Sequence, residues 1–177
     1  MKPTIIAIVG ASGSGKTTLS KYLRQRFEIP VIVSTTTRPR RESEAEGEDY
    51  FFVSSTKAYR REDMLTYTRF GKYEYFSLRR QLPASGHCSY VVDENGVKAL
   101  KRSAGERYNV FAVYVACRRE TLLARGIEAE RIARDSHRPQ VDYSQIDVVL
   151  GNNGSEEEFQ EAAEQLMQIL EQWRHLQ

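Results

Sequence analysis

The chain has 177 residues, of which 40% are hydrophobic and 28% charged, a composition typical of one soluble globular domain. Its formal net charge of +2 provides no overall field, so we expect neither nucleic acid nor a membrane surface as a partner. Cys88 and Cys117 show no paired spacing, which predicts reduced thiols and a cytoplasmic location. The apolar run at residues 4–9 is too short to span a membrane and no cleavage site follows it, so a secretory signal is not expected.

Apolar runs and helical patterns alternate along the chain. Residues 4–9 are continuously apolar and rich in β-branched side chains, as in a buried parallel strand. Further strands are predicted at residues 31–33, 50–53, 89–92, 110–116 and 146–150, with an extended stretch at 64–77. Helices are predicted after the glycine-rich segment, from residue 55, at 78–84, at 94–103, twice within 118–137 around Gly126, and after Ser155, which forms a capping box with Glu158. This alternation predicts a mostly parallel sheet with helices on both faces and a small insertion in the middle.

A glycine-rich segment follows the first strand and precedes the first helix, which is the order that a P-loop requires. It reads Gly10-Ala11-Ser12-Gly13-Ser14-Gly15-Lys16-Thr17, followed by Thr18. The glycines let the backbone curl so that its N–H groups point at phosphate oxygens, and the helix start adds its positive dipole end. Lys16 would place its ammonium group on the β- and γ-phosphates of ATP, and the Thr17 hydroxyl would ligate Mg²⁺. The segment predicts a loop that binds a nucleoside triphosphate and not a chance Gly/Ser-rich turn.

The P-loop by itself does not distinguish a kinase from a GTPase, an ATPase or a motor. The segment Asp93-Glu94-Asn95-Gly96 matches the D-x-x-G pattern of a GTPase switch. However, the sequence contains no N-K-x-D segment that would recognise a guanine base as GTPases do. A GTPase is therefore disfavoured.

Three arginines, Arg38, Arg40 and Arg41, follow the second predicted strand within four positions. Guanidinium groups so arranged can hold a second phosphate through paired hydrogen bonds, and Tyr50 and Tyr75 can add hydroxyl donors. Charge alone favours a solvated basic turn, balanced by the acidic residues that follow it.

The wider sequence pattern decides between these interpretations, because it resembles the guanylate kinase family. The family signature is close to S-x-T-T-R-x-x-R-x-x-E-x-x-G-x-x-Y-x-F, and it is matched in spacing by Ser34, Thr36, Thr37, Arg38, Arg41, Glu44, Gly47, Tyr50 and Phe52. Weaker matches extend over most of the chain and comprise Tyr75, Ser77, Asp93, Gly96, Val97, Arg125, Arg134 and Asn152.

The resemblance implies a P-loop NTPase fold with three α/β/α layers. It implies a core at residues 1–33, 84–117 and 139–177, an acceptor-binding region at 34–83 and a short lid at 118–138. The activity implied is that of a nucleoside monophosphate kinase, a monomer or homodimer that uses ATP and Mg²⁺ and has GMP as the favoured acceptor.

The resemblance also implies roles for individual residues. The catalytic residues implied are Lys16, Arg38, Arg41, Arg125 and Arg134. Residues implied to bind the acceptor are Ser34, Arg38, Arg41, Tyr50, Tyr75, Ser77 and Asp93, with Ser34 and Asp93 on the base. Arg131 would close over the ATP phosphates with the other lid arginines, and Asn152 would lie near the adenine.

One position departs from the family pattern. Where the family has a glutamate that accepts hydrogen bonds from guanine, the sequence has Thr66, and Glu74 falls on the opposite face of a strand. Two alternatives therefore stay open beside GMP phosphorylation. One is a kinase of the same fold for a different phosphorylated acceptor. The other is a non-catalytic binding module, although such modules tend to lose the P-loop, which is complete here.

Overall fold

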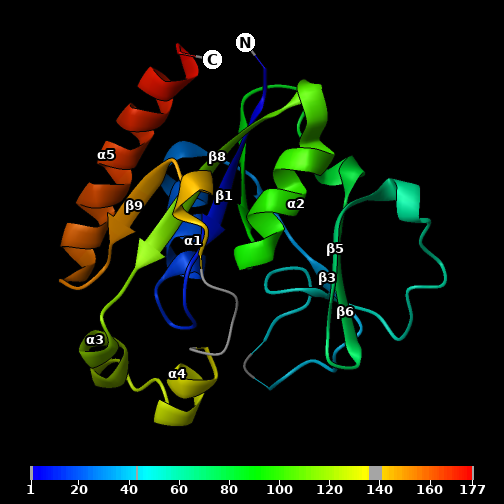
Figure 1. Ribbon diagram of the computed structural model, residues 1–177, viewed down its shortest axis with the longest axis horizontal. Coiled ribbons are helices and arrows are strands. Elements are labelled where there is room, and N and C mark those ends of the chain that lie inside the picture. Colours follow the sequence, from blue (N-terminus) through cyan, green and yellow to red (C-terminus); the bar gives the residue numbers. More distant parts are fainter. Residues whose placement is uncertain (1, 43, 136–140, 177) are drawn as a thin grey trace.

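The computed structural model describes residues 2–42, 44–135 and 141–176 and shows a parallel five-stranded sheet at the centre of the molecule (Figure 1). The strand order is β2-β7-β1-β8-β9, and every neighbouring pair is parallel. The strands are β1 (Thr4–Val9), β2 (Val31–Ile32), β7 (His87–Val91), β8 (Asn109–Ala116) and β9 (Val148–Gly151). All six residues of β1 are fully buried, which explains why this strand has no polar alternation.

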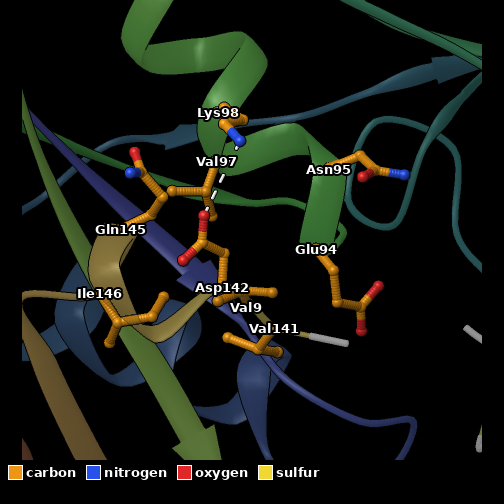
Figure 2. A pocket seen from close by; sticks show the side chains of 9 residues that line it. All are labelled: Val9, Glu94, Asn95, Val97, Lys98, Val141, Asp142, Gln145 and Ile146. Atoms are coloured by element: carbon orange, nitrogen blue, oxygen red, sulfur yellow. Dashed lines mark ion pairs between the residues drawn. The ribbon is translucent and has the colours of Figure 1, made fainter. Parts of the chain in front are cut away.

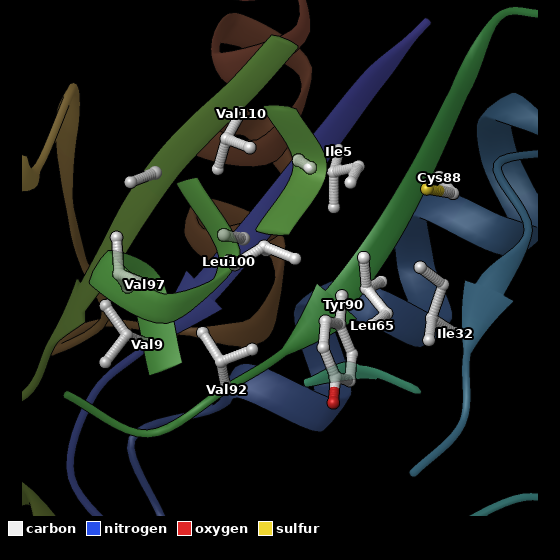
Figure 3. Packing of buried hydrophobic residues seen from close by; sticks show 13 residues of the cluster. Ile5, Val9, Ile32, Leu65, Cys88, Tyr90, Val92, Val97, Leu100 and Val110 are labelled. Carbon is white, nitrogen blue, oxygen red and sulfur yellow. The ribbon is translucent and has the colours of Figure 1, made fainter. Parts of the chain in front are cut away.

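Helices cover both faces of this sheet and confirm the predicted three-layer α/β/α architecture. They are α1 (Lys16–Phe27), α2 (Glu94–Ala104) and α5 (Glu156–Arg174). α1 and α5 pack on one face, where Leu19 and Leu166 meet Phe111 of β8. α2 packs on the other face through Val97 and Leu100 (Figure 3). The ring centres of Trp173 and Phe111 are 5.1 Å apart, so Trp173 packs α5 against β8.

A second, four-stranded sheet, which we call the acceptor sheet, lies to one side of the core (Figure 1). Its order is β4-β3-β6-β5, from β3 (Thr35–Thr36), β4 (Phe51–Phe52), β5 (Met64–Phe70) and β6 (Tyr73–Leu78). β5 and β6 form an antiparallel hairpin, so the predicted extended stretch is two paired strands. Leu65 of β5 is buried in the same hydrophobic cluster as α2, so the acceptor sheet is anchored directly to the core.

Two short helices, α3 (Arg119–Ala124) and α4 (Ala129–Asp135), follow β8 on either side of Gly126, as predicted. We call these two helices and the turn between them the lid. The predicted lid and last helical pattern continue to residues 137–138, and that part lies outside the described residues.

Three local predictions were wrong. Residues 54–60 form turns and bends without a helix, because Ser55 caps only a turn through the amide of Lys57. Residues 78–84 hold only a 3₁₀ turn at Arg79–Gln81, which Pro83 follows closely. The last strand begins at Val148, not at residue 146, because a 3₁₀ turn occupies Tyr143–Gln145.

The final helix begins as its sequence predicts. The Ser155 hydroxyl accepts a hydrogen bond from the Glu158 amide, and the Glu158 carboxylate accepts one from the Ser155 amide. Within the described ranges, no helix is long and apolar enough to cross a lipid bilayer.

We predict that the packing of α5 carries a large share of core stability. Leu166 is 1% exposed, so Leu166→Ala should lower the free energy of unfolding by about 2–5 kcal/mol. Ile169→Ala on the same helix, at a side chain that is 42% exposed, should cost about 1 kcal/mol or less. Urea unfolding of both variants measures the difference, and equal losses would contradict this packing.

Candidate active site

The P-loop connects β1 to α1 with a curled backbone. Gly13 and Gly15 have φ angles of 77° and 105°, which L side chains rarely adopt. The Lys16 ammonium donates to the carbonyl oxygens of Gly10 and Ala11 at 2.8 and 2.7 Å. Thr17 and Thr18 are exposed on the first turn of α1. The loop thus has the backbone that phosphate binding requires, and its lysine lies against the loop itself.

Asn152, which follows β9, braces the P-loop from behind. Its side chain is 5% exposed, and its Nδ2 donates to the Ser14 carbonyl at 2.7 Å. A Cβ atom on Gly15 would lie only 2.3 Å from this Nδ2, so the close approach requires glycine there. Arg125 donates to Asn152 Oδ1 at 2.9 Å, which ties the end of α3 to the same amide. The structure therefore joins the buried Asn152 and the exposed Arg125 in one brace behind the P-loop.

The lid lies directly against the P-loop. A Cβ atom on Gly13 would meet the Ile127 side chain at 2.6 Å, so Ile127 covers the tip of the loop. The Ser12 amide donates to Asp135 Oδ2 at 2.7 Å. A carboxylate thus occupies an amide donor of a loop whose geometry suits phosphate oxygens. Arg131 is half-buried on α4, and the side chain of Arg134 lies outside the described part of the structure.

A cationic cluster, separate from Lys16 of the P-loop, lies at the end of the acceptor sheet. The Arg38 guanidinium donates to Glu44 Oε1 at 2.6 Å and lies 5.5 Å from the centre of the Tyr50 ring. The rings of Tyr50 and Tyr75 are 6.0 Å apart. Arg38, Tyr50 and Tyr75, which the sequence predicts together, are therefore adjacent in space.

The charges within this cluster stabilise one another. The hydrogen bond with Glu44 raises the pKa of Arg38 above its usual value. Desolvation favours a raised pKa for Glu44, but hydrogen bonds from Arg38 and from the Arg41 amide hold that pKa below its usual range. Burial, and then the neighbouring Tyr75, raise the pKa of Tyr50, so its hydroxyl keeps its proton as a donor.

Arg41 is the more accessible arginine of the pair. Its side chain is 58% exposed, whereas that of Arg38 is 12% exposed. Its guanidinium lies 4.0 Å from Glu44, which is a weak contact at the surface. A ligand phosphate that reaches this cluster would therefore find Arg41 free to move and Arg38 fixed in place.

Two hollows flank the start of α1 and the P-loop. One, of about 120 Å³, is bordered by Thr17 at the end of the P-loop and by Ser34 and Tyr50 of the acceptor region. The other, of about 200 Å³, lies beside Val9, between α2 and residues 141–146 (Figure 2). Figure 2 shows Lys98 of α2 facing Asp142 across it, at 3.8 Å. The first hollow brings residues of both predicted sites together.

Four hydroxyl groups form a connected set beside the first hollow, and we call Ser34, Thr66, Ser77 and Tyr90 the hydroxyl network. Tyr90 bonds Ser34 at 3.1 Å and Thr66 at 2.7 Å, and Thr66 bonds Ser77 at 2.9 Å. Glu74 points to the other face of the hairpin, where Tyr67 and Thr56 donate to it, as its strand position predicts.

Asp93 has a different local role. Its Oδ1 accepts a hydrogen bond from the Gly96 amide at 2.6 Å and so caps the N-terminus of α2. Its side chain is exposed at this helix end. The structure brings Asp93 to the same edge of the sheet as the P-loop, because it follows β7 beside β1.

Sequence reasoning did not single out three residues that lie at these sites. Tyr90 sits in an apolar strand and has no pattern that would reveal its hydroxyl contacts. Asp135 is a single acidic residue in an arginine-rich segment. Its contact with the Ser12 amide is apparent only when α4 is placed against the P-loop. Glu44 belongs to the signature, but its pairing with Arg38 is visible only in three dimensions.

Three features together define the class of P-loop nucleoside monophosphate kinases. They are a parallel α/β/α core, a curled G-x-x-x-x-G-K-T loop after its central strand, and a separate cationic cluster across a hollow. The comparison with known sequences agrees, because the sequence profile described as guanylate kinase matches residues 1–173. The chain belongs to the guanylate kinase family.

Individual relatives support this assignment. The guanylate kinase of Thermotoga maritima is 32% identical over 143 residues, which cover 73% of this chain and 68% of that protein. The guanylate kinase of Chlamydia trachomatis is 38% identical over 109 residues, which cover 56% of this chain and 53% of its own length. The match thus spans about half of the Chlamydia protein.

A solved structure shows the same fold. The crystal structure of guanylate kinase from Anaplasma phagocytophilum superposes with a TM-score of 0.65 at 21% sequence identity. The superposition covers 96% of this chain and 86% of the Anaplasma chain.

We predict that Asp135 competes with the nucleotide for the P-loop, because its carboxylate occupies the Ser12 amide. Asp135→Asn removes the charge from this hydrogen bond, which should tighten Mg·ATP binding about fivefold, the difference between a charged and a neutral hydrogen bond. Calorimetric titration measures the affinity. Asp142→Asn, after the lid and away from the loop amides, is the matched control, and unchanged or weaker binding by Asp135→Asn contradicts the prediction.

Proposed function

We propose that the protein transfers the γ-phosphate of ATP to a nucleoside monophosphate, with GMP as the favoured acceptor. One observation carries this proposal: Thr17 of the P-loop and Tyr50 of the Arg38 cluster border the same hollow. A hollow bordered by residues of both proposed phosphate sites suits transfer between two bound phosphates, and the family membership of the chain supports this activity.

The reaction needs positioning and charge stabilisation more than covalent chemistry. In our proposal, Lys16 leaves the carbonyls of Gly10 and Ala11 and moves to the β- and γ-phosphates of ATP. Arg38 and Arg41 hold the acceptor phosphate in line with the group that moves. The acceptor phosphate is itself a nucleophile near neutral pH, so no protein general base is required.

Mg²⁺ would neutralise charge on the β- and γ-phosphates when it is bound. The residues present fit such an ion. Thr17 offers an exposed hydroxyl oxygen beside the hollow, and Mg²⁺ usually takes only one or two protein ligands in addition to phosphates and water.

The regions of the chain divide between these tasks in our proposal. Residues 34–83 bind the acceptor, residues 118–138 form the lid, and the remainder is the core. The lid arginines Arg125, Arg131 and Arg134 would close over ATP. Asn152 would lie beside them, near the adenine. The two unpaired thiols, Cys88 and Cys117, favour a cytoplasmic location for the enzyme.

A different phosphorylated acceptor is the second candidate, and Thr66 favours it. Its hydroxyl bonds Ser77 and Tyr90 at a position where a carboxylate would read guanine. A neutral hydroxyl discriminates among bases less strongly than a carboxylate that accepts hydrogen bonds from two donors of the base.

The test is an ADP-release assay with Mg·ATP and a panel of monophosphates. We expect turnover with GMP, and Lys16→Ala should lower kcat by about 10²–10³, the usual loss of a charge-stabilising group in phosphoryl transfer. Circular dichroism and thermal melting show that the variant is folded. Turnover of Lys16→Ala at the level of the unaltered protein would remove the central assignment.

A second prediction separates the acceptor site from the ATP site. Arg41→Ala should raise KM for GMP about tenfold or more, because a hydrogen bond to a charged group is lost, and leave KM for ATP nearly unchanged. Arg40→Ala is the matched control, because Arg40 carries the same charge in the same turn and donates to the Glu44 carbonyl. If both variants change KM for GMP equally, Arg41 has no specific role.

A further inference from the structure

The chain crosses between the core and the acceptor sheet twice. Val33 and Ser34 form the outward crossing, which joins β2 of the core to β3 of the acceptor sheet. The 3₁₀ turn Arg79–Gln81 lies in the return crossing, between β6 of the acceptor sheet and β7 of the core. The placement of the acceptor sheet beside the core in Figure 1 therefore depends on how these two crossings are held.

The side chain of Gln81 joins the two crossings to each other. Its Nε2 donates to the Val33 carbonyl at 2.9 Å, and its Oε1 accepts a hydrogen bond from the Leu78 amide at 3.1 Å. The side chain is partly buried, and both ends of its amide group are used. Because one planar amide binds both segments, the outward crossing is held against the end of β6.

Arg79 joins the same turn to two further elements. Its Nε donates to the Glu62 carbonyl at 3.2 Å, and its Nη1 donates to the Ser103 carbonyl at 2.9 Å. Glu62 lies immediately before β5 of the acceptor sheet, and Ser103 lies in the last turn of α2. Carbonyl groups in a last turn have no partner within the helix, and a cation there also interacts favourably with the helix dipole. Arg79 therefore links the acceptor sheet to a helix of the core.

The hydrogen bonds of this turn fix what the apolar anchor at Leu65 leaves free. A hydrophobic contact is non-directional, so it holds two surfaces together without fixing how one slides over the other. A hydrogen bond weakens steeply when donor and acceptor are misaligned, so it fixes the register as well. The turn at Arg79–Gln81 binds four backbone groups in this way, which belong to Val33, Glu62, Leu78 and Ser103.

We propose that the turn Arg79–Gln81 is a clasp that sets the acceptor sheet against the P-loop, with Gln81 and Arg79 as positioning residues for phosphoryl transfer. The proposal rests on the proposed function. In that function, Arg38 and Tyr75 hold the acceptor phosphate on the acceptor sheet, whereas the P-loop belongs to the core. Each site stays intact when the clasp is opened, but the two bound phosphates lose their alignment. A misplacement of about 1 Å can lower a reaction rate about 100-fold.

The test compares kcat for GMP phosphorylation with the Kd of Mg·ATP and of GMP, each measured alone by calorimetry. Gln81→Met should lower kcat about tenfold or more and leave both Kd values unchanged. Gln81→Glu keeps the acceptor for the Leu78 amide but loses the donor to the Val33 carbonyl, so its kcat should fall equally. Arg79→Met should lower kcat about threefold, because its contacts are exposed to solvent.

Arg80→Met is the matched control. Arg80 lies in the same turn, is exposed and has no side-chain hydrogen bond among the described residues, so its loss should leave kcat unchanged. An unchanged kcat in Gln81→Met, or an equal loss in Arg80→Met, overturns the proposal. A loss of either binary affinity in parallel with kcat, or of the folded state in thermal melting, shows a merely structural role and also overturns it. Absence of turnover by the unaltered protein with every monophosphate instead overturns the proposed function.

Discussion

The amide of Asn152 holds the P-loop in place, and the arrangement of the remaining site depends on it. Its Nδ2 binds the Ser14 carbonyl, its Oδ1 accepts from Arg125, and its own backbone amide continues the hydrogen bonding of β8 and β9 through Ala116. One buried group therefore connects the central sheet, the loop and the end of α3 in the lid. A buried amide that lost any of these partners would leave a polar group unsatisfied in a tightly packed region.

The acceptor sheet is attached to the core by two kinds of contact. Leu65 enters the hydrophobic cluster under α2, and the Tyr90 hydroxyl reaches out of that cluster to Thr66. An apolar anchor and a polar contact from neighbouring residues of β5 fix both the position and the rotation of the hairpin.

The sequence predicts the core of the fold well, because those elements are set by local patterns. The apolar run of β1, the P-loop and the Ser155 capping box each depend on a few neighbouring residues, and the structure has all three. The errors at residues 54–60 and 78–84 fall where a turn capped by Ser55 and the nearby Pro83 prevent a helix. The contacts of Tyr90, Asp135 and Glu44 join residues far apart in sequence or separated by an irregular loop, so no single-sequence pattern reveals them.

The position of the lid has a kinetic consequence. Ile127 covers Gly13, and Asp135 occupies the Ser12 amide. A ligand that takes the Ser12 amide must therefore displace the Asp135 carboxylate, although Gly13, Thr17 and Thr18 are exposed to solvent. When this displacement precedes binding, the association rate depends on the displacement equilibrium in addition to diffusion.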